Sequence, residues 1–158
     1  MGDVNTDCCW WEGVSCDVLG HVIGLDLSYQ NISGNFHSIF NLHHLQRLNL
    51  AGNNFNTTLR SYGFAKLPNL THLNLSSSCF HGQISVGMSY LTRLVSLDLS
   101  KQHDCYQRYY HFLDSYNDIY YHVPLPYQLE QSLKLENPDF KTFTKNLRYL
   151  RELYLDGV

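Results

Sequence analysis

Three cysteines near the start of the chain have a spacing that could support chemistry. Cys8, Cys9 and Cys16 form the pattern C-C-x6-C. Thiols so arranged could bind a metal ion or form disulfides, but the chain contains no C-x-x-C pair and no histidine at a ligand spacing beside them. The pattern therefore favours disulfide chemistry, which implies an oxidising compartment. Cys79 stands apart, and we expect it to be a small thiol, exposed or half-buried.

Four asparagines stand in N-x-S/T sequons, which accept N-linked glycans in secreted proteins. They are Asn31, Asn56, Asn69 and Asn74. The pattern also recurs by chance in a chain rich in Asn and Ser. Four copies in so short a stretch nevertheless fit a secretory route.

No arrangement of residues in the sequence predicts catalysis. The chain lacks the G-x-S-x-G turn of hydrolases, the H-E-x-x-H zinc motif, a P-loop and a glycine-rich dinucleotide-binding turn. Between His103 and Tyr127, histidines and Cys105 offer metal-binding groups, but their spacing is irregular. We therefore expect no enzyme activity, no metal site and no cofactor.

Composition and charge argue against two kinds of partner. The sequence is 44% hydrophobic and 16% charged, which indicates a folded domain. Its net charge is -3, and the basic residues form no run that would attract nucleic acid. No apolar stretch approaches the roughly 18 residues of a membrane span. The segment from Met1 to Asp7 lacks the basic and apolar regions of a signal peptide.

A repeated leucine pattern indicates the fold that holds the cysteines and the sequons. The frame L-x-x-L-x-L begins at Leu45, Leu70, Leu94 and Leu150, and a fifth copy begins with Val22. The alternation L-x-L suits a short strand with one buried face. The residues between the two leucines should then point outward; they are Asp26, Asn49, Asn74, Asp98 and Tyr154.

The spacing of the copies predicts a leucine-rich repeat. The second leucines of the first four copies, Leu25, Leu48, Leu73 and Leu97, are 23, 25 and 24 residues apart. This spacing lies within the leucine-rich-repeat range of about 20 to 29 residues. The alternative of amphipathic helices with leucine stripes is disfavoured, because clusters of Asn, Gly and Ser after each L-x-L would break them.

Apolar residues also recur behind each predicted strand. Ile32, Phe55 and Phe80 should fill the interior. Further along each copy, apolar residues recur three apart, which suits a turn of 3₁₀ helix on the convex side. These sets are Ile39, Leu42 and Leu45, then Phe64, Leu67 and Leu70, then Met88, Leu91 and Leu94.

One position of the repeat is usually asparagine, whose side chain bonds the backbone of neighbouring coils. Here it holds Gln30, Asn53, Ser78, Gln102 and Val158. Only Asn53 keeps the usual residue, so we expect a looser ladder of hydrogen bonds.

The sequence thus predicts an α/β-type solenoid, a leucine-rich-repeat coil with a parallel concave sheet and a disulfide-containing amino-terminal cap. We assign 1–20 to a partial cap and 21–102 to repeats 1–4. An irregular Tyr-rich insertion follows at 103–131, which could be a contact loop or a solvated loop without a partner. Residues 132–158 form one or more further, truncated repeats.

Several motifs resemble plant extracellular proteins. The segment D-C-C-W-W-E-G-V-S-C-D from Asp7 to Asp17, followed by a first repeat, resembles the amino-terminal cap of plant leucine-rich-repeat receptors. F-H-G-Q-I from Phe80 resembles the plant form of the repeat, which adds a second short strand. The stretches from Leu133 to Asp139 and from Asn146 to Val158 resemble early repeats of disease-resistance receptor-like proteins.

This resemblance implies a binding ectodomain. Such receptor-like proteins sit at the extracellular face of the plasma membrane, detect a peptide or protein ligand from pathogen or host, and signal through a partner receptor kinase. Receptor kinases and secreted polygalacturonase inhibitors share the cap and repeats, so both remain alternatives. In the family, a helix with a further cysteine and a signal peptide precede the double cysteine, whereas only seven residues precede Cys8. We therefore expect a fragment, or a non-functional truncated gene product.

The resemblance also implies site residues. In the cap we predict a disulfide between Cys9 and Cys16, which enclose a short loop whose Trp10, Trp11 and Val14 could cover the end of the core. The concave face should bind the ligand through the variable strand positions Gln46, Arg47, Asn49, Thr71, His72, Asn74, Val95, Ser96 and Asp98. A glycan on Asn74 would mask part of this face.

Overall fold

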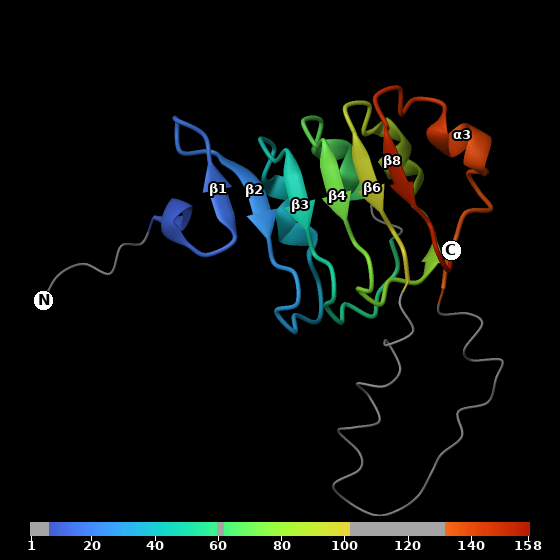
Figure 1. Ribbon diagram of the computed structural model, residues 1–158, viewed down its shortest axis with the longest axis horizontal. Helices are drawn as coiled ribbons and strands as arrows, with labels where there is room; N and C mark the ends of the chain where they lie inside the picture. Colours follow the sequence, from blue (N-terminus) through green and yellow to red (C-terminus); the bar gives the residue numbers. More distant parts are fainter. Residues whose placement is uncertain (1–6, 60–61, 102–131) are drawn as a thin grey trace, which may run out of the picture.

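The computed structural model describes residues 7–59, 62–101 and 132–158. The ladder position Gln102 and the insertion predicted at 103–131 lie outside the described residues. Figure 1 shows the described part as a row of stacked coils, with the cap at one end and α3 (Phe140–Thr144) at the other.

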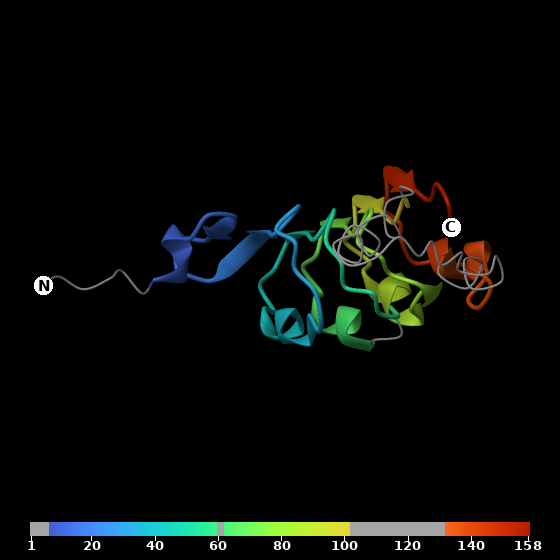
Figure 2. The same cartoon turned by 90° about the horizontal axis from the view of Figure 1, so that it is seen from below.

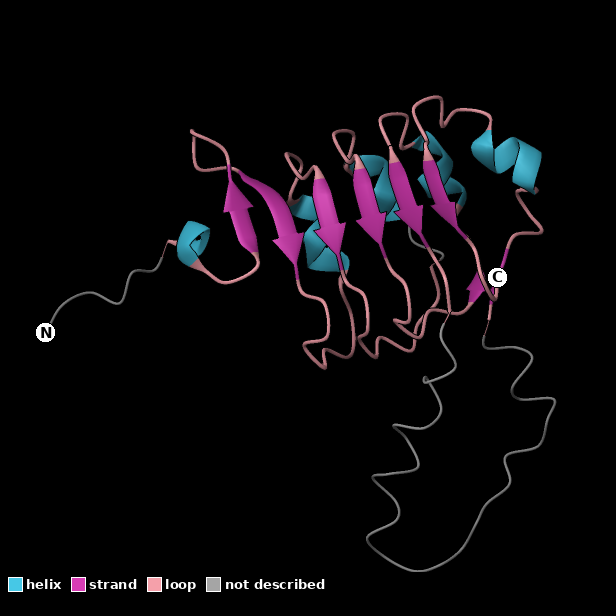
Figure 3. Ribbon diagram, viewed as in Figure 1, coloured by secondary structure: helices cyan, strands magenta, loops and turns pink. Residues whose placement is uncertain are grey.

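One main sheet runs along the whole row of coils. Its strands in spatial order are β1 (Val14–Cys16), β2 (Val22–Asp26), β3 (Arg47–Asn49), β4 (His72–Asn74), β6 (Ser96–Asp98) and β8 (Glu152–Tyr154). The strands from β2 to β8 pair in parallel, which confirms the predicted sheet (Figure 3). The cap adds β1, which is antiparallel to β2 and which the repeat frame does not predict.

The register of the sheet follows the leucine frame. The middle residues of successive strands pair directly, in the order Leu25, Leu48, Leu73, Leu97 and Leu153. Of these, Leu48, Leu73 and Leu97 are buried in the core, and Leu25 and Leu153 pack against it at the two ends of the row. Each repeat therefore places its leucine in register with the one before.

Short helical turns close the back of the coils. The elements η2 (His37–Asn41), η3 (Tyr62–Lys66) and η4 (Val86–Tyr90) are 3₁₀ helices, as the spacing of three predicts. In the last coil α3 is one α-helical turn, and the Asp139 side chain accepts a hydrogen bond from the Thr142 amide at 2.8 Å. Figure 2 shows the main sheet and these turns on opposite sides of the coils.

A second, smaller sheet lies along the coils. It pairs β5 (Gly82–Gln83) in parallel with β7 (Leu133–Lys134). β5 lies within the motif F-H-G-Q-I, so the additional strand predicted from that motif is present.

Aromatic rings fill the space between the main sheet and the back. Phe36, Phe55 and Phe80 are buried, with ring centroids 5.2 to 5.5 Å apart. Phe40 and Phe64 meet edge to face at 5.1 Å behind them. The burial predicted for Phe55 and Phe80 is confirmed, and Ile32 is partly buried against the same core.

The ladder between coils is uneven, as its mixed residues predict. Buried Asn53 donates to the carbonyls of Leu27 and Leu50 at 2.8 and 2.9 Å. Ser78 donates to Leu50 O at 2.6 Å, so at this position one short side chain reaches the backbone of the previous coil. Gln30 is exposed, and among the described residues its side chain bonds only Ser28 O, within its own coil. The first coil is therefore held less tightly through this position.

The cap is built on the predicted disulfide. Cys9, in η1 (Cys8–Trp10), is bonded to Cys16 of β1. Asp7 caps η1 by accepting a hydrogen bond from the Cys9 amide at 2.9 Å. Gly13 has φ 79°, and a Cβ there would lie 2.1 Å from Asp26 O, so only glycine lets the cap approach β2 this closely.

Two expectations about the cap and the cysteines are wrong. Trp10 and Trp11 are 77% and 59% exposed, so neither covers the core. Val14 is half-buried. Cys79 is disulfide-bonded and is not a thiol. Among the described helices, none has the length and apolar character that crossing a bilayer requires.

Candidate functional site

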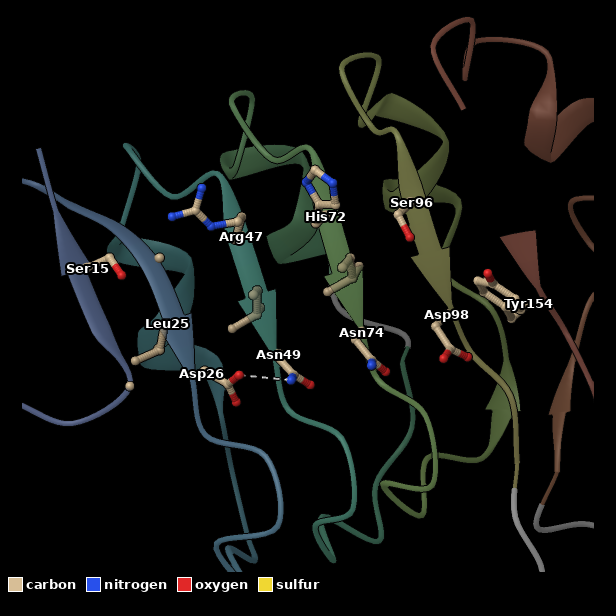
Figure 4. A pocket seen from close by; sticks show the side chains of 14 residues that line it. Ser15, Leu25, Asp26, Arg47, Asn49, His72, Asn74, Ser96, Asp98 and Tyr154 are labelled. Carbon is tan, nitrogen blue, oxygen red and sulfur yellow. Dashed lines mark hydrogen bonds between the residues drawn. The ribbon is translucent and has the colours of Figure 1, made fainter. Parts of the chain in front are cut away.

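Two rows of side chains lie on the surface of the main sheet that points away from the core, here called the sheet face. Each strand has a leucine between two residues that point outward. The register places Gly24, Arg47, His72, Ser96 and Glu152 in the first row and Asp26, Asn49, Asn74, Asp98 and Tyr154 in the second. Figure 4 shows most of both rows side by side.

A groove of about 490 Å³ follows the two rows. It begins at Gly13 and Ser15 of the cap and extends to Tyr154 of β8. All residues of both rows line it except Glu152. The groove is long and crosses parallel strands, so it suits an extended segment better than a small compact molecule.

Hydrogen bonds to the turn after each strand fix the second row. Asp26, Asn74 and Asp98 each accept through Oδ1 from the amide and hydroxyl of the serine two residues later, at 2.6 to 3.0 Å. Asn49 accepts from the Ala51 amide at 3.1 Å. These turns use one oxygen of each side chain. Within the part of the chain that the structure describes, the second polar atoms of Asn74 and Asp98 have no hydrogen-bond partner and face the groove.

Asp26 supplies a stable negative charge at the cap end of the groove. Partial burial alone would raise the pKa of Asp26, but hydrogen bonds from the Ser28 hydroxyl, the Ser28 amide and Asn49 outweigh it. The bond from Asn49 Nδ2 to Asp26 Oδ2 measures 3.1 Å (Figure 4). The pKa of Asp26 therefore lies below its usual 3.8, and the carboxylate stays ionised in mildly acidic solution.

Arg47 and His72 supply the basic groups of the first row. The guanidinium of Arg47 lies close to Gly24, since a Cβ built at this glycine would be in ordinary van der Waals contact with Arg47 Nη2, at 3.5 Å. The Thr71 hydroxyl donates to Gln46 O at 2.9 Å and lies 2.9 Å from His72 Nδ1. Because that hydroxyl has one hydrogen, His72 Nδ1 must donate to it. His72 Nε2 then remains available as an acceptor.

The structure separates the predicted ligand-binding residues into two sets. Six line the groove, namely Arg47, Asn49, His72, Asn74, Ser96 and Asp98. Three do not line it, namely Gln46, Thr71 and Val95. They stand just before the strands, and the backbone amide of each donates a hydrogen bond to a carbonyl of the preceding coil. The frame also contains Asp26 and Tyr154, which the prediction of contact residues left out. Ser15 could not be found this way, because it comes from the antiparallel cap strand.

The four sequon asparagines have different surroundings. Asn31 and Asn56 are exposed and have positive φ, at 55° and 44°. Asn69 donates to His43 O at 3.2 Å and accepts from Arg93 at 3.0 Å. Asn74 lines the groove, where the sequence analysis placed it.

Curated relatives of the chain share a common name. Receptor-like protein 6 of Arabidopsis thaliana is 49% identical over 98% of this chain and 14% of its own length. The receptor-like protein Cf-9 homolog of Solanum lycopersicum is 36% identical over 98% of this chain and 15% of its own length. The chain thus spans about one seventh of the length of each of these two relatives. No protein-family model matches it.

A solved structure agrees with the fold. The leucine-rich-repeat ectodomain of the Arabidopsis receptor kinase HAESA, solved in complex with an N-terminally extended IDA peptide hormone ligand, is 27% identical with a TM-score of 0.51. The match covers 60% of this chain and 20% of that chain.

Proposed function

Because this chain is homologous to plant receptor-like proteins over almost its whole length, we propose that it is part of a ligand-binding ectodomain. The ligand is an extended extracellular peptide or protein segment that lies in the groove. The observation that carries this proposal is the pair of polar rows crossing the parallel strands. The ectodomain of HAESA, which has the same repeat fold, was solved with a peptide hormone.

The chemistry of the groove favours peptide recognition. Arg47 offers a cation at one edge, while the ionised carboxylate of Asp26 and the side chain of Asp98 lie in the other row. Between them, His72 and Asn74 provide acceptor and donor groups at the centre of the sheet face. A peptide backbone needs both donors and acceptors along its length, and side chains of opposite charge would fix its direction.

We place this activity outside the cell, in a longer protein that acts in pathogen perception and passes its signal to a partner receptor kinase. The disulfide between Cys9 and Cys16 and the four sequons support an extracellular location. The Cf-9-type relative supports the defence assignment.

Peptide capture tests the proposal. The full 158-residue chain, secreted from a plant host and immobilised, is incubated with peptides from extracellular fluid, and retained peptides are quantified by mass spectrometry. Arg47→Ala should lower retention of the specific peptide by roughly tenfold, because a charge-assisted contact is lost. The control Lys66→Ala, in η3 on the opposite side, also removes one positive charge and should retain the peptide.

The result is decisive in either direction. A peptide retained by the parent chain and by Lys66→Ala, but lost from Arg47→Ala, supports the groove. Equal retention by all three chains, or no peptide retained by the parent, contradicts it.

A further inference from the structure

Two histidines from consecutive coils lie face to face beside the main sheet. His21 and His44 each stand four residues before the leucine of their strand, Leu25 and Leu48. The repeat therefore brings them together although 23 residues separate them in the sequence. Their ring centroids are 3.9 Å apart and their planes differ by 7°. His21 is half-buried and His44 is exposed.

Asp17 is held beside these rings by the cap hairpin. Its amide donates to His21 O at 2.9 Å, and its Oδ1 accepts from the amides of Leu19 and His21 at 2.9 and 3.0 Å. These bonds fix the carboxylate, so its second oxygen, Oδ2, is directed at His21 Nδ1 at 3.1 Å.

We propose that Asp17, His21 and His44 bind a divalent transition-metal ion of the Zn²⁺ type. One ligand atom from each residue lies within 4.8 Å of the other two. Imidazole nitrogen and carboxylate oxygen are ligands that Zn²⁺ prefers, and three protein ligands leave a fourth position for water. The second group of candidate ligands, Asp7, Cys8 and Cys9, fits poorly because the Cys9 sulfur is already in a disulfide.

Metal binding requires a small, local rearrangement. Tetrahedral Zn²⁺ with bonds near 2.1 Å spaces its ligand atoms by roughly 3.4 Å, close to the separation between Asp17 and His21. The ring of His44 must leave the stack to point a nitrogen lone pair at the ion. Its exposure permits this movement, and none of the described residues forms a hydrogen bond with its ring.

The ion would join two parts of the fold. Asp17 and His21 belong to the hairpin of the cap, whereas His44 lies in the segment that leads into β3. Among the described residues the Gln30 side chain bonds only Ser28 O of its own coil, so this ladder position adds no hydrogen bond toward the cap. A bound ion therefore adds a cross-link between the cap and the first full coil, and zinc should raise the melting temperature.

Calorimetric titration of ZnCl₂ into the full chain tests this site. The parent carries Cys8→Ser, which removes the free thiol found among the described cysteines. We expect one ion per chain, a higher melting temperature with zinc, and an affinity weakened at least roughly tenfold in His44→Ala. His43→Ala is the matched control, since it removes the neighbouring exposed imidazole and should bind zinc like the parent.

A second variant and a spectroscopic measurement guard against a folding defect. Asp17→Asn keeps the oxygen that accepts the turn hydrogen bonds but loses the charge, so it should also weaken binding while circular dichroism stays unchanged. X-ray absorption at the zinc edge should show two imidazole ligands and no sulfur. No binding by the parent, equal binding by His44→Ala, or a sulfur ligand would each overturn the proposal.

Discussion

Asn53 Oδ1 accepts a hydrogen bond at 2.9 Å from the amide of Ile32, a residue of the preceding coil. The same side chain donates through Nδ2 to Leu27 O of that coil and to Leu50 O of its own. One amide group thus satisfies three backbone groups between coils. At the equivalent position, the Gln30 side chain donates to Ser28 O, its one hydrogen-bond partner in the described part of the chain.

Asn53→Ala should lower the free energy of unfolding by about 1 to 3 kcal/mol, because buried backbone groups lose their partners. Gln30→Ala is the matched control and should change it by less than about 0.5 kcal/mol, since Gln30 is exposed. Urea unfolding followed by circular dichroism measures both. Equal effects of the two substitutions would show that the ladder does not stabilise the fold.

The leucine frame predicted much of this fold because every copy must bury leucines at the same positions of its coil. A leucine at a fixed place in every coil must reach the same depth, so Leu48, Leu73 and Leu97 align without any knowledge of the rest. The same logic predicted the outward positions Asn49 and Asp98.

Other features depend on contacts that no local pattern records. β1 has no leucine frame, so neither its antiparallel pairing nor the place of Ser15 in the groove could be derived. The exposure of Trp10 depends on what surrounds the cap, not on the type of residue. His21 and His44 were missed because a full repeat separates them.

The cap disulfide can be mapped without reduction. Glutamyl endopeptidase cleaves after Glu12, between Cys9 and Cys16, so the two resulting peptides should remain linked until reductant is added. Replacing both cysteines by serine should cost about 2.5 kcal/mol from the loop-closure entropy of so short a loop. Two separate peptides in the unreduced digest would disprove the pairing.

Asp26 should make the stability of the cap end depend on acid pH. Its pKa in the folded chain lies below 3.8, so its stabilising effect is complete above about pH 5 and is lost as the pH falls through 3.8 and then through the folded value. Asn49→Ala removes one of the hydrogen bonds to the carboxylate and should raise the pKa of Asp26 toward 3.8. Carboxyl NMR titration of both chains checks this, and an unchanged pKa would contradict it.

Glycan mapping should distinguish the sequons. We expect Asn31 and Asn56 to carry glycans in protein from a plant host, because both side chains are exposed. Enzymatic glycan removal in heavy-oxygen water, followed by mass spectrometry, labels each occupied site. A glycan at Asn74 would fill the middle of the groove and count against peptide binding there.

β1 is antiparallel to β2, whereas all later strands of the main sheet are parallel, so the two ends of the row of coils differ. The hydrogen bonds of β1 to β2 occupy that edge of β2, so no parallel coil can pair with β2 on the cap side. The parallel coils therefore extend from β2 in one direction, away from the cap. Duplication or deletion of repeats beyond β2 would change the length of the groove. Its cap end would stay at Gly13 and Ser15.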